Sequence, residues 1–193
     1  MIVVFGGLNM DLVFPVQHLP RPGETVLGTR YQTVAGGKGA NQAVAACRAG
    51  AATAMAGCVG QDAFGDLVVE ELRAAGVNGS AIGRVDEPTG CAAIGVDSAA
   101  ENQIMVASGA NLRARADQVP DSFLTPETTV LLQLEVTIEE NWRLLARAKS
   151  AGARTVLNAA PAHPIPGHVL ADLDALIMNE HETETIALSL IHI

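Results

Sequence analysis

Aromatic and basic residues are both scarce in this chain of 193 residues. It contains one Trp, one Tyr and four Phe, and its formal net charge is −9. Proteins that bind nucleic acid usually present a basic surface and aromatic side chains on which bases stack. We therefore expect no nucleic-acid partner. A small-molecule ligand is favoured, and an anionic one would need local positive groups because the overall charge repels it.

Cysteines and long apolar runs are scarce as well. Cys47, Cys58 and Cys91 are odd in number and form no Cys-x-x-Cys pair, which favours reduced thiols over a disulfide or zinc framework. No apolar run has the length of a membrane span, and the N-terminus lacks the basic and apolar regions of a signal peptide. The sequence thus predicts a cytoplasmic protein that does not associate with membranes.

Short apolar runs alternate with amphipathic segments along the chain, and this order is typical of an α/β fold. Buried strands are expected at 2–5, 53–59, 129–134, 154–158 and 174–179. Their alternation with helices predicts a doubly wound, mostly parallel sheet with right-handed crossovers. Two less apolar stretches, near 12–35 and 89–108, are expected to pair as a small second sheet that acts as a flap over a ligand.

A glycine-rich turn runs directly into an alanine-rich helix at 34–43. Gly36, Gly37 and Gly39 surround Lys38, so the backbone can adopt positive φ angles and approach a ligand closely. Free N–H groups at the start of a helix favour oxygens or anions. The alternative is a tight turn that caps a packed helix. The spacing matches neither a Walker A loop nor the Gly-x-Gly-x-x-Gly dinucleotide motif.

Polar side chains follow several of the predicted strands. Asn9 and Asp11 come after the first strand, Glu135 after the strand at 129–134, and Asn158 and Asn179 end the last two. Open α/β sheets bind ligands at the carboxyl ends of their strands, and amides with carboxylates can hydrogen-bond several hydroxyl groups. The alternatives are Asx turns and helix caps, which these residues form readily.

Together these blocks resemble the ribokinase-like (PfkB) carbohydrate kinases, over about residues 1–187. The matching blocks are Gly6-Gly7-Leu8-Asn9-Met10-Asp11, Pro22-Gly23-Glu24-Thr25, Gly36-Gly37-Lys38-Gly39-Ala40-Asn41-Gln42-Ala43, Thr89-Gly90, Gly109-Ala110-Asn111, Gln133-Leu134-Glu135 and Asn179-Glu180-His181-Glu182. Within the family, the unbroken glycine-lysine run and the Asn-x-Asp motif are most similar to the ribokinases. The resemblance implies a ribokinase-like fold with a β-sheet lid, in which the lid also forms a homodimer contact.

The resemblance further implies an activity: phosphorylation of ribose at its 5-hydroxyl by ATP, with Mg²⁺ and a monovalent cation such as K⁺. The positions that match sugar contacts are Asn9, Asp11, Gly37, Lys38, Asn41 and Glu135. Asn179 and Glu182 match an Asn-x-x-Glu motif associated with ATP phosphate and, indirectly, with magnesium. His181 replaces the small residue expected between them, which puts the local geometry of that motif in doubt.

One element of the resemblance is missing. In this family the catalytic base is the Asp of an Asp-Thr-x-Gly-Ala-Gly-Asp motif, and the chain contains no such motif. We therefore expect residues 1–187 to be the N-terminal part of one truncated domain with no catalytic residue of its own, and the apolar end at 188–193 to be non-native. A catalytically inactive sugar-binding fragment, or a kinase for another sugar or nucleoside, remains an alternative because fold does not assign substrate.

Overall fold

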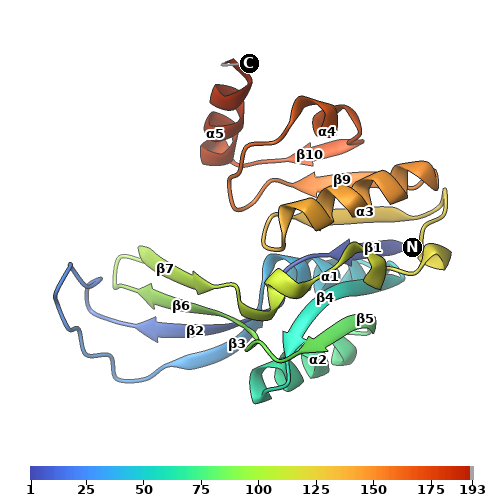
Figure 1. Ribbon diagram of the computed structural model, residues 1–193. Coiled ribbons are helices and arrows are strands. Elements are labelled where there is room, and N and C mark those ends of the chain that lie inside the picture. Colours follow the sequence, from blue (N-terminus) through green and yellow to red (C-terminus); the bar gives the residue numbers. More distant parts are fainter. Residues whose placement is uncertain (192–193) are drawn as a thin grey trace.

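The main body of the protein is a six-stranded parallel sheet. The computed structural model describes residues 1–191 (Figure 1) and orders these strands β10-β9-β8-β1-β4-β5. They are β1 (Ile2–Phe5), β4 (Thr53–Gly60), β5 (Asn78–Val85), β8 (Thr129–Gln133), β9 (Arg154–Asn158) and β10 (Ala175–Ile177). Every neighbouring pair runs parallel. The expected doubly wound α/β fold is confirmed.

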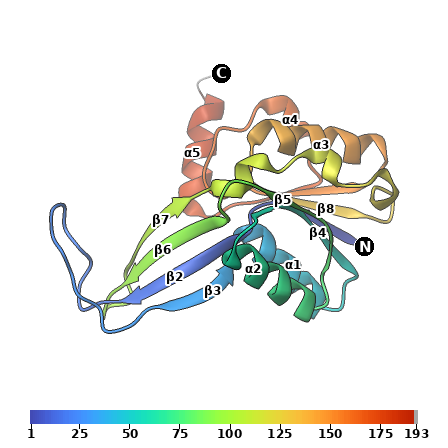
Figure 2. The ribbon, with the colours of Figure 1, turned by 60° about the horizontal axis from the view of Figure 1, so that its bottom comes forward.

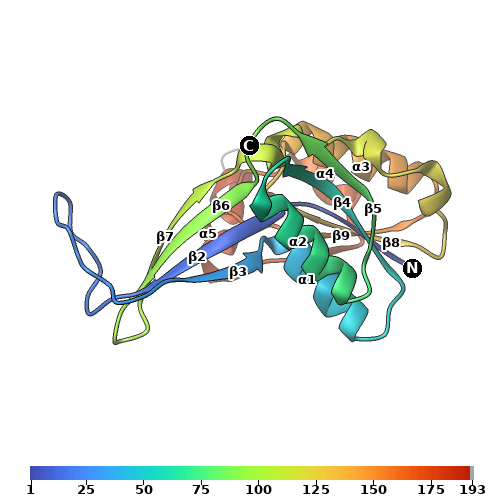
Figure 3. The same ribbon diagram turned by 90° about the horizontal axis from the view of Figure 1, so that it is seen from below.

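Helices cover both faces of this sheet. Helices α1 (Lys38–Arg48) and α2 (Ala63–Ala74) lie together on one face, while α3 (Ile138–Ser150) and α4 (Gly167–Ala171) lie on the other (Figure 3). Successive side chains of a strand point to opposite faces. Accordingly Val4 packs in the core under α1 and α2, whereas Val3 and Phe5 pack in the core under α3. Burial on both sides explains why β1 is apolar throughout.

A second sheet projects from the body as a lid (Figures 1 and 2). Its strands, in the order β3-β2-β6-β7, are β3 (Gln32–Gly36), β2 (Asn9–Pro15), β6 (Gly90–Val96) and β7 (Asn102–Ala107). The pair β2–β6 is parallel and the two outer pairs are antiparallel. Residues 16–31, inside the stretch expected to hold lid strands, form a loop. Pro20 and Pro22 explain this, since proline cannot donate to a strand ladder.

Three short 3₁₀ helices carry the chain from the lid back to the body: η1 (Gly109–Arg113), η2 (Ala116–Gln118) and η3 (Asp121–Phe123). The last described helix is α5 (Glu180–Ile191). The sequence predicts a non-native tail at 188–193. Residues 192–193 of this tail lie outside the described part of the chain, and the tail stays a prediction. Within residues 1–191, no helix has the length and apolar character that crossing a bilayer requires.

Candidate functional site

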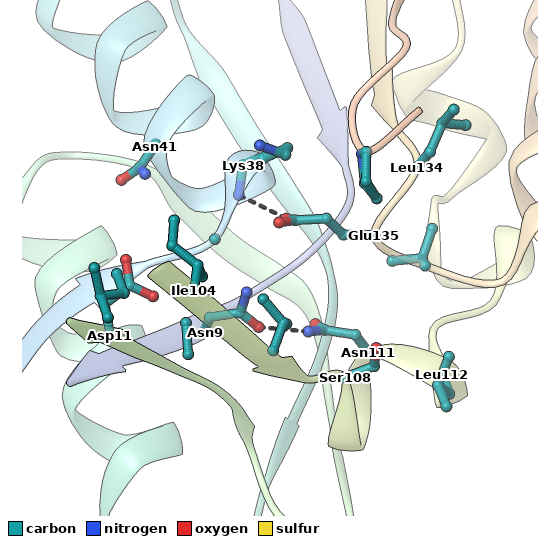
Figure 4. A pocket seen from close by; sticks show the side chains of 16 residues that line it. Asn9, Asp11, Lys38, Asn41, Ile104, Ser108, Asn111, Leu112, Leu134 and Glu135 are labelled. Atoms are coloured by element: carbon teal, nitrogen blue, oxygen red, sulfur yellow. Dashed lines mark hydrogen bonds between the residues drawn. The ribbon is translucent and has the colours of Figure 1, made fainter. Parts of the chain in front are cut away.

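A cavity of about 490 Å³ lies where the carboxyl ends of β1 and β8 meet the lid. Its polar wall contains all six residues that the sequence analysis matched to sugar contacts: Asn9, Asp11, Gly37, Lys38, Asn41 and Glu135 (Figure 4). Its apolar wall comes from the lid strands, with Ala92, Ile94, Ile104 and Val106. A cavity with one polar wall and one apolar wall suits a small ligand that carries several hydroxyl groups. The roles of the six residues stay predictions.

The glycine turn brings the start of α1 against the end of β1. Gly37 has φ +90°, and a Cβ there would lie 2.6 Å from the Gly7 carbonyl oxygen and 2.8 Å from the Asn9 nitrogen. A Cβ on Gly39 would lie 2.8 Å from the same carbonyl oxygen, which accepts a hydrogen bond of 3.1 Å from the Ala40 N–H. Only glycine permits an approach this close. Close packing against the segment after β1 therefore requires these glycines, independently of any contact with a ligand.

Glu135 connects β8 to the first turn of α1. Its Oε2 accepts a hydrogen bond of 2.6 Å from the Lys38 backbone N–H, which is one of the free donors at a helix N-terminus. Burial raises the pKa of Glu135, and this hydrogen bond and the Lys38 charge oppose that shift only in part. The second carboxylate oxygen has no hydrogen-bond partner among the described residues.

Asp11 is the second carboxylate of the cavity. It lies on β2, and a Cβ on the neighbouring Gly36 would fall 2.2 Å from its Oδ2, so the glycine makes room for it. Burial raises the pKa of Asp11 while the Lys38 charge lowers it by less. Within residues 1–191 no group donates a hydrogen bond to this carboxylate. The cavity thus offers carboxylate acceptors that only a ligand or water can satisfy.

The raised pKa of Glu135 has a consequence for stability. A carboxyl group that holds its proton more tightly when folded makes the protein less stable as pH rises past its unfolded pKa. Glu135→Gln keeps an acceptor for the Lys38 N–H and removes the buried charge. We expect it to raise the free energy of unfolding at about pH 7, with the gain disappearing below about pH 4, near the usual pKa of Glu. Urea denaturation across this pH range measures the effect.

Glu140 provides a control of opposite sign. Burial would raise its pKa, but hydrogen bonds from the Ala116 N–H and Arg143 outweigh burial and lower it. Its ionised form therefore adds stability above the unfolded pKa, and that stability is lost as pH falls through the folded pKa. Glu140→Gln should destabilise the protein at neutral pH. If Glu135→Gln also destabilises the protein at neutral pH, the raised pKa assigned to Glu135 is contradicted.

Sequence reasoning missed a role for Asn111. Gly109-Ala110-Asn111 entered only as a block that resembles the family, and Asn111 was assigned no contact. In the structure Asn111 is 1% exposed, lines the cavity, and donates a 2.7 Å hydrogen bond from Nδ2 to Asn9 Oδ1. A polar residue directly after the lid hairpin was the available signal, but its partner lies 102 positions away.

Asn179 and Glu182 are not brought to the cavity with the other six residues. They form a reciprocal cap at the start of α5: the Asn179 N–H donates to Glu182 Oε2, and the Glu182 N–H donates to Asn179 Oδ1, both at 2.8 Å. This is the geometry of a capping box. In the described part of the chain no group of three or more His, Cys, Asp or Glu side chains is arranged to hold a metal ion. The roles of Asn179 and Glu182 toward phosphate and magnesium stay predictions.

Known proteins resemble the chain over nearly its whole length. A profile of the "pfkB family carbohydrate kinase" group matches residues 1–191. A ribokinase of Haemophilus influenzae is 37% identical over 96% of this chain and 61% of its own length, and one of Bacillus subtilis is 36% identical over 96% and 64%. A solved ribokinase from Thermotoga maritima has a TM-score of 0.85 at 35% identity, covering 97% of this chain and 61% of that one.

A second solved relative was determined with ligands. It is a ribokinase of Arabidopsis thaliana complexed with ribose and ATP, with a TM-score of 0.83 and 32% identity, covering 99% of this chain and 67% of that one. The chain thus spans less than two thirds of the length of the curated relatives from Haemophilus influenzae and Bacillus subtilis.

Proposed function

The chain belongs to the pfkB family of carbohydrate kinases, and from this premise we propose that it is the sugar-binding part of an ATP-dependent kinase that acts on D-ribose. The observation that carries the proposal is the cavity, which gathers Asn9, Asp11, Gly37, Lys38, Asn41 and Glu135 beneath the lid. Ribokinases as relatives at 36–37% identity support ribose over other sugars.

The cavity supplies what a neutral polyol needs. Asp11 and Glu135 accept hydrogen bonds from sugar hydroxyls, the Asn9 and Asn41 amides complete the polar wall, and Lys38 places a positive charge near the transferred phosphoryl group. Phosphoryl transfer depends on positioning, charge neutralisation and a base for the attacking hydroxyl. This chain contributes the positioning. Closure of the lid's apolar roof excludes water from the sugar.

The base is the part that this chain does not supply. The Asp-Thr-x-Gly-Ala-Gly-Asp motif implied by the family is absent from the printed sequence. We infer that these 193 residues bind sugar without turning it over, and that the kinase activity belongs to a longer form. A coupled ATPase assay with ribose tests this inference: sustained turnover by the 193-residue chain would contradict it.

The nucleotide, the ions and the quaternary structure complete the proposal. ATP supplies the phosphoryl group, with Asn179 and Glu182 near its phosphates and with Mg²⁺ and K⁺ as ions of the longer form. A homodimer through the lid is supported by Met105 on β7, which is 71% exposed and lies on the face of the strand opposite to the cavity-lining Ile104 and Val106. A cytoplasmic location is consistent with Cys47, Cys58 and Cys91 as free thiols.

Calorimetric titration of the chain with a panel of ligands tests the proposed substrate. The panel contains D-ribose, D-xylose, D-fructose, 2-deoxy-D-ribose and adenosine, so that other sugars and nucleosides compete directly with ribose. We expect D-ribose to bind most tightly. Preferred binding of adenosine or fructose would replace ribose as the substrate while leaving the site in place, and absence of binding by every member would refute the proposal.

A further inference from the structure

The amides of Asn9 and Asn111 form a buried pair on the cavity wall. Asn9 is 3% exposed and Asn111 is 1% exposed. Asn111 accepts a 2.9 Å hydrogen bond from the Leu8 backbone N–H at Oδ1, and it donates from Nδ2 to Asn9 Oδ1 at 2.7 Å. Figure 4 shows the second bond as a dashed line, with the nitrogen of Asn9 pointing away from Asn111.

The Leu8 N–H determines the orientation of both amides. A backbone N–H can only donate, so the Asn111 atom that faces it must be the oxygen. The other terminal atom of Asn111 is then the NH₂ group, which can only donate, so the Asn9 atom that faces it must also be oxygen. It follows that the remaining atom of Asn9 is Nδ2. No described residue accepts a hydrogen bond from this nitrogen.

Gly90 leaves room for the amide pair of Asn9 and Asn111 because it has no side chain. It lies beside Asn9 in the parallel register of β2 and β6. A Cβ at Gly90 would lie 2.1 Å from Asn9 Oδ1 and 2.4 Å from Asn111 Nδ2, the two atoms that share the hydrogen bond. Contacts that short cannot be accommodated without moving one amide. The lid strand therefore carries a glycine at the position where the pair passes beneath it.

We propose that Asn111 is a positioning residue of the sugar site: it holds the Asn9 amide so that Nδ2 presents a hydrogen-bond donor to a sugar oxygen. This inference rests on the proposed function. The same wall holds the carboxylates of Asp11 and Glu135, which accept hydrogen bonds, and the Lys38 ammonium, which donates them. A donor held in one orientation near two carboxylate acceptors constrains how a sugar ring can lie, because a hydroxyl must accept from the first and donate to the others.

Two substitutions reverse the polarity of this position by different routes. In Asn111→Asp one carboxylate oxygen still accepts from the Leu8 N–H, but the other cannot donate, so the Asn9 amide turns over and its oxygen faces the cavity. In Asn9→Asp the new carboxylate accepts from Asn111 Nδ2 and places its second oxygen in the cavity. Both variants exchange a donor for an acceptor.

Singly fluorinated riboses detect this exchange, because a C–F group can accept a weak hydrogen bond and cannot donate one. For each hydroxyl position, calorimetry gives the ratio of the dissociation constants of the fluorinated sugar and ribose. At one position we expect this ratio to rise at least about tenfold in both variants, since fluorine then faces an acceptor. A general loss of structure would weaken both ligands in parallel and leave the ratio unchanged.

A double-mutant cycle separates positioning from direct contact. If Asn111 acts through Asn9, Asn111→Asp should leave the fluorine ratio unchanged in an Asn9→Ala background. Asn141→Asp is the matched control, because Asn141 is a fully buried amide outside the cavity that donates to the Gln133 carbonyl at 2.7 Å. It should lower the melting temperature without changing the ratio.

The possible outcomes are distinct. If the wild-type chain binds no ribose, the proposed function fails and the positioning role fails with it. If it binds ribose but the ratios stay unchanged in the variants, the positioning role alone is overturned. Should Asn111→Asp show no cooperative unfolding transition, Asn9→Asp still tests the donor at Asn9 because it preserves both hydrogen bonds of Asn111, and an unchanged ratio in that variant overturns the proposal.

Discussion

Asp11→Ala is expected to weaken binding of D-ribose by more than about tenfold, the cost of removing a charged acceptor from ligand hydroxyls. Asp11 is half-buried on β2 and no described residue donates to its carboxylate, so its hydrogen-bonding capacity is left for the ligand. Burial raises the pKa of Asp11, and the positive charge of Lys38 opposes that shift in part. Calorimetric titration with ribose measures the loss.

Asp66→Asn is the matched control for Asp11→Ala. It also removes one negative charge, but its side chain is 71% exposed and pairs with Arg84 at 2.7 Å on the surface. Exposed ion pairs contribute little to stability, and Asp66 lies outside the cavity. The affinity of the Asp66→Asn variant for ribose should match that of the wild type. Equal dissociation constants for the Asp11→Ala variant and the wild type would count against the site.

Gly37→Ala is expected to lower the free energy of unfolding by roughly 2–5 kcal/mol, the sum of backbone strain and overpacking. The residue has φ +90°, and a Cβ would lie 2.6 Å from the Gly7 carbonyl oxygen and 2.8 Å from the Asn9 nitrogen. Relief of these contacts requires Gly37 and the segment Gly7–Asn9 to move apart, which changes the position of Asn9 relative to Gly37 and Lys38 in the cavity. Chemical denaturation and ribose titration should therefore both show a loss.

Gly50→Ala separates the two causes. Gly50 has φ +92°, nearly the same as Gly37, but a Cβ there would meet no atom within 4 Å. The free energy of unfolding of this variant should fall only by the cost of left-handed backbone strain, about 1–2 kcal/mol. Its affinity for ribose should stay unchanged. If Gly50→Ala and Gly37→Ala destabilise the protein equally, the close approach of α1 to β1 is not what requires glycine at position 37.

The elements that sequence reasoning predicted best are those with a local signal. The run at 2–5 is apolar because β1 is buried on both faces, and it became a central strand. By contrast β5 was not recognised as a strand of the main sheet. It lies at the edge, is only partly buried, and includes Gly79, Ser80, Gly83 and Arg84. An edge strand has less need of apolar residues, so its pattern is weaker.

In the candidate site, too, residues with a local sequence signal could be predicted and contacts between distant residues could not. Asn9, Gly37 and Lys38 could be predicted because polar and glycine residues follow a buried strand or precede a helix, which are recognisable positions. Glu135 could be placed at a strand end, but nothing local indicated that it accepts from the Lys38 N–H, 97 positions away. Likewise the polar pair Asn179 and Glu182 matched a motif, and only the structure showed that they cap α5.

The sequence by itself determined the α/β class, because that depends on residue type and spacing along the chain, and its resemblance to the family pointed to the residues on the polar wall. The tertiary structure decided which way the polar groups point. The free donor of Asn9 follows from the Leu8 N–H through Asn111, a residue 102 positions from Asn9 that only the folded chain brings to the cavity. The physical reason is that an amide presents a donor or an acceptor according to its partner.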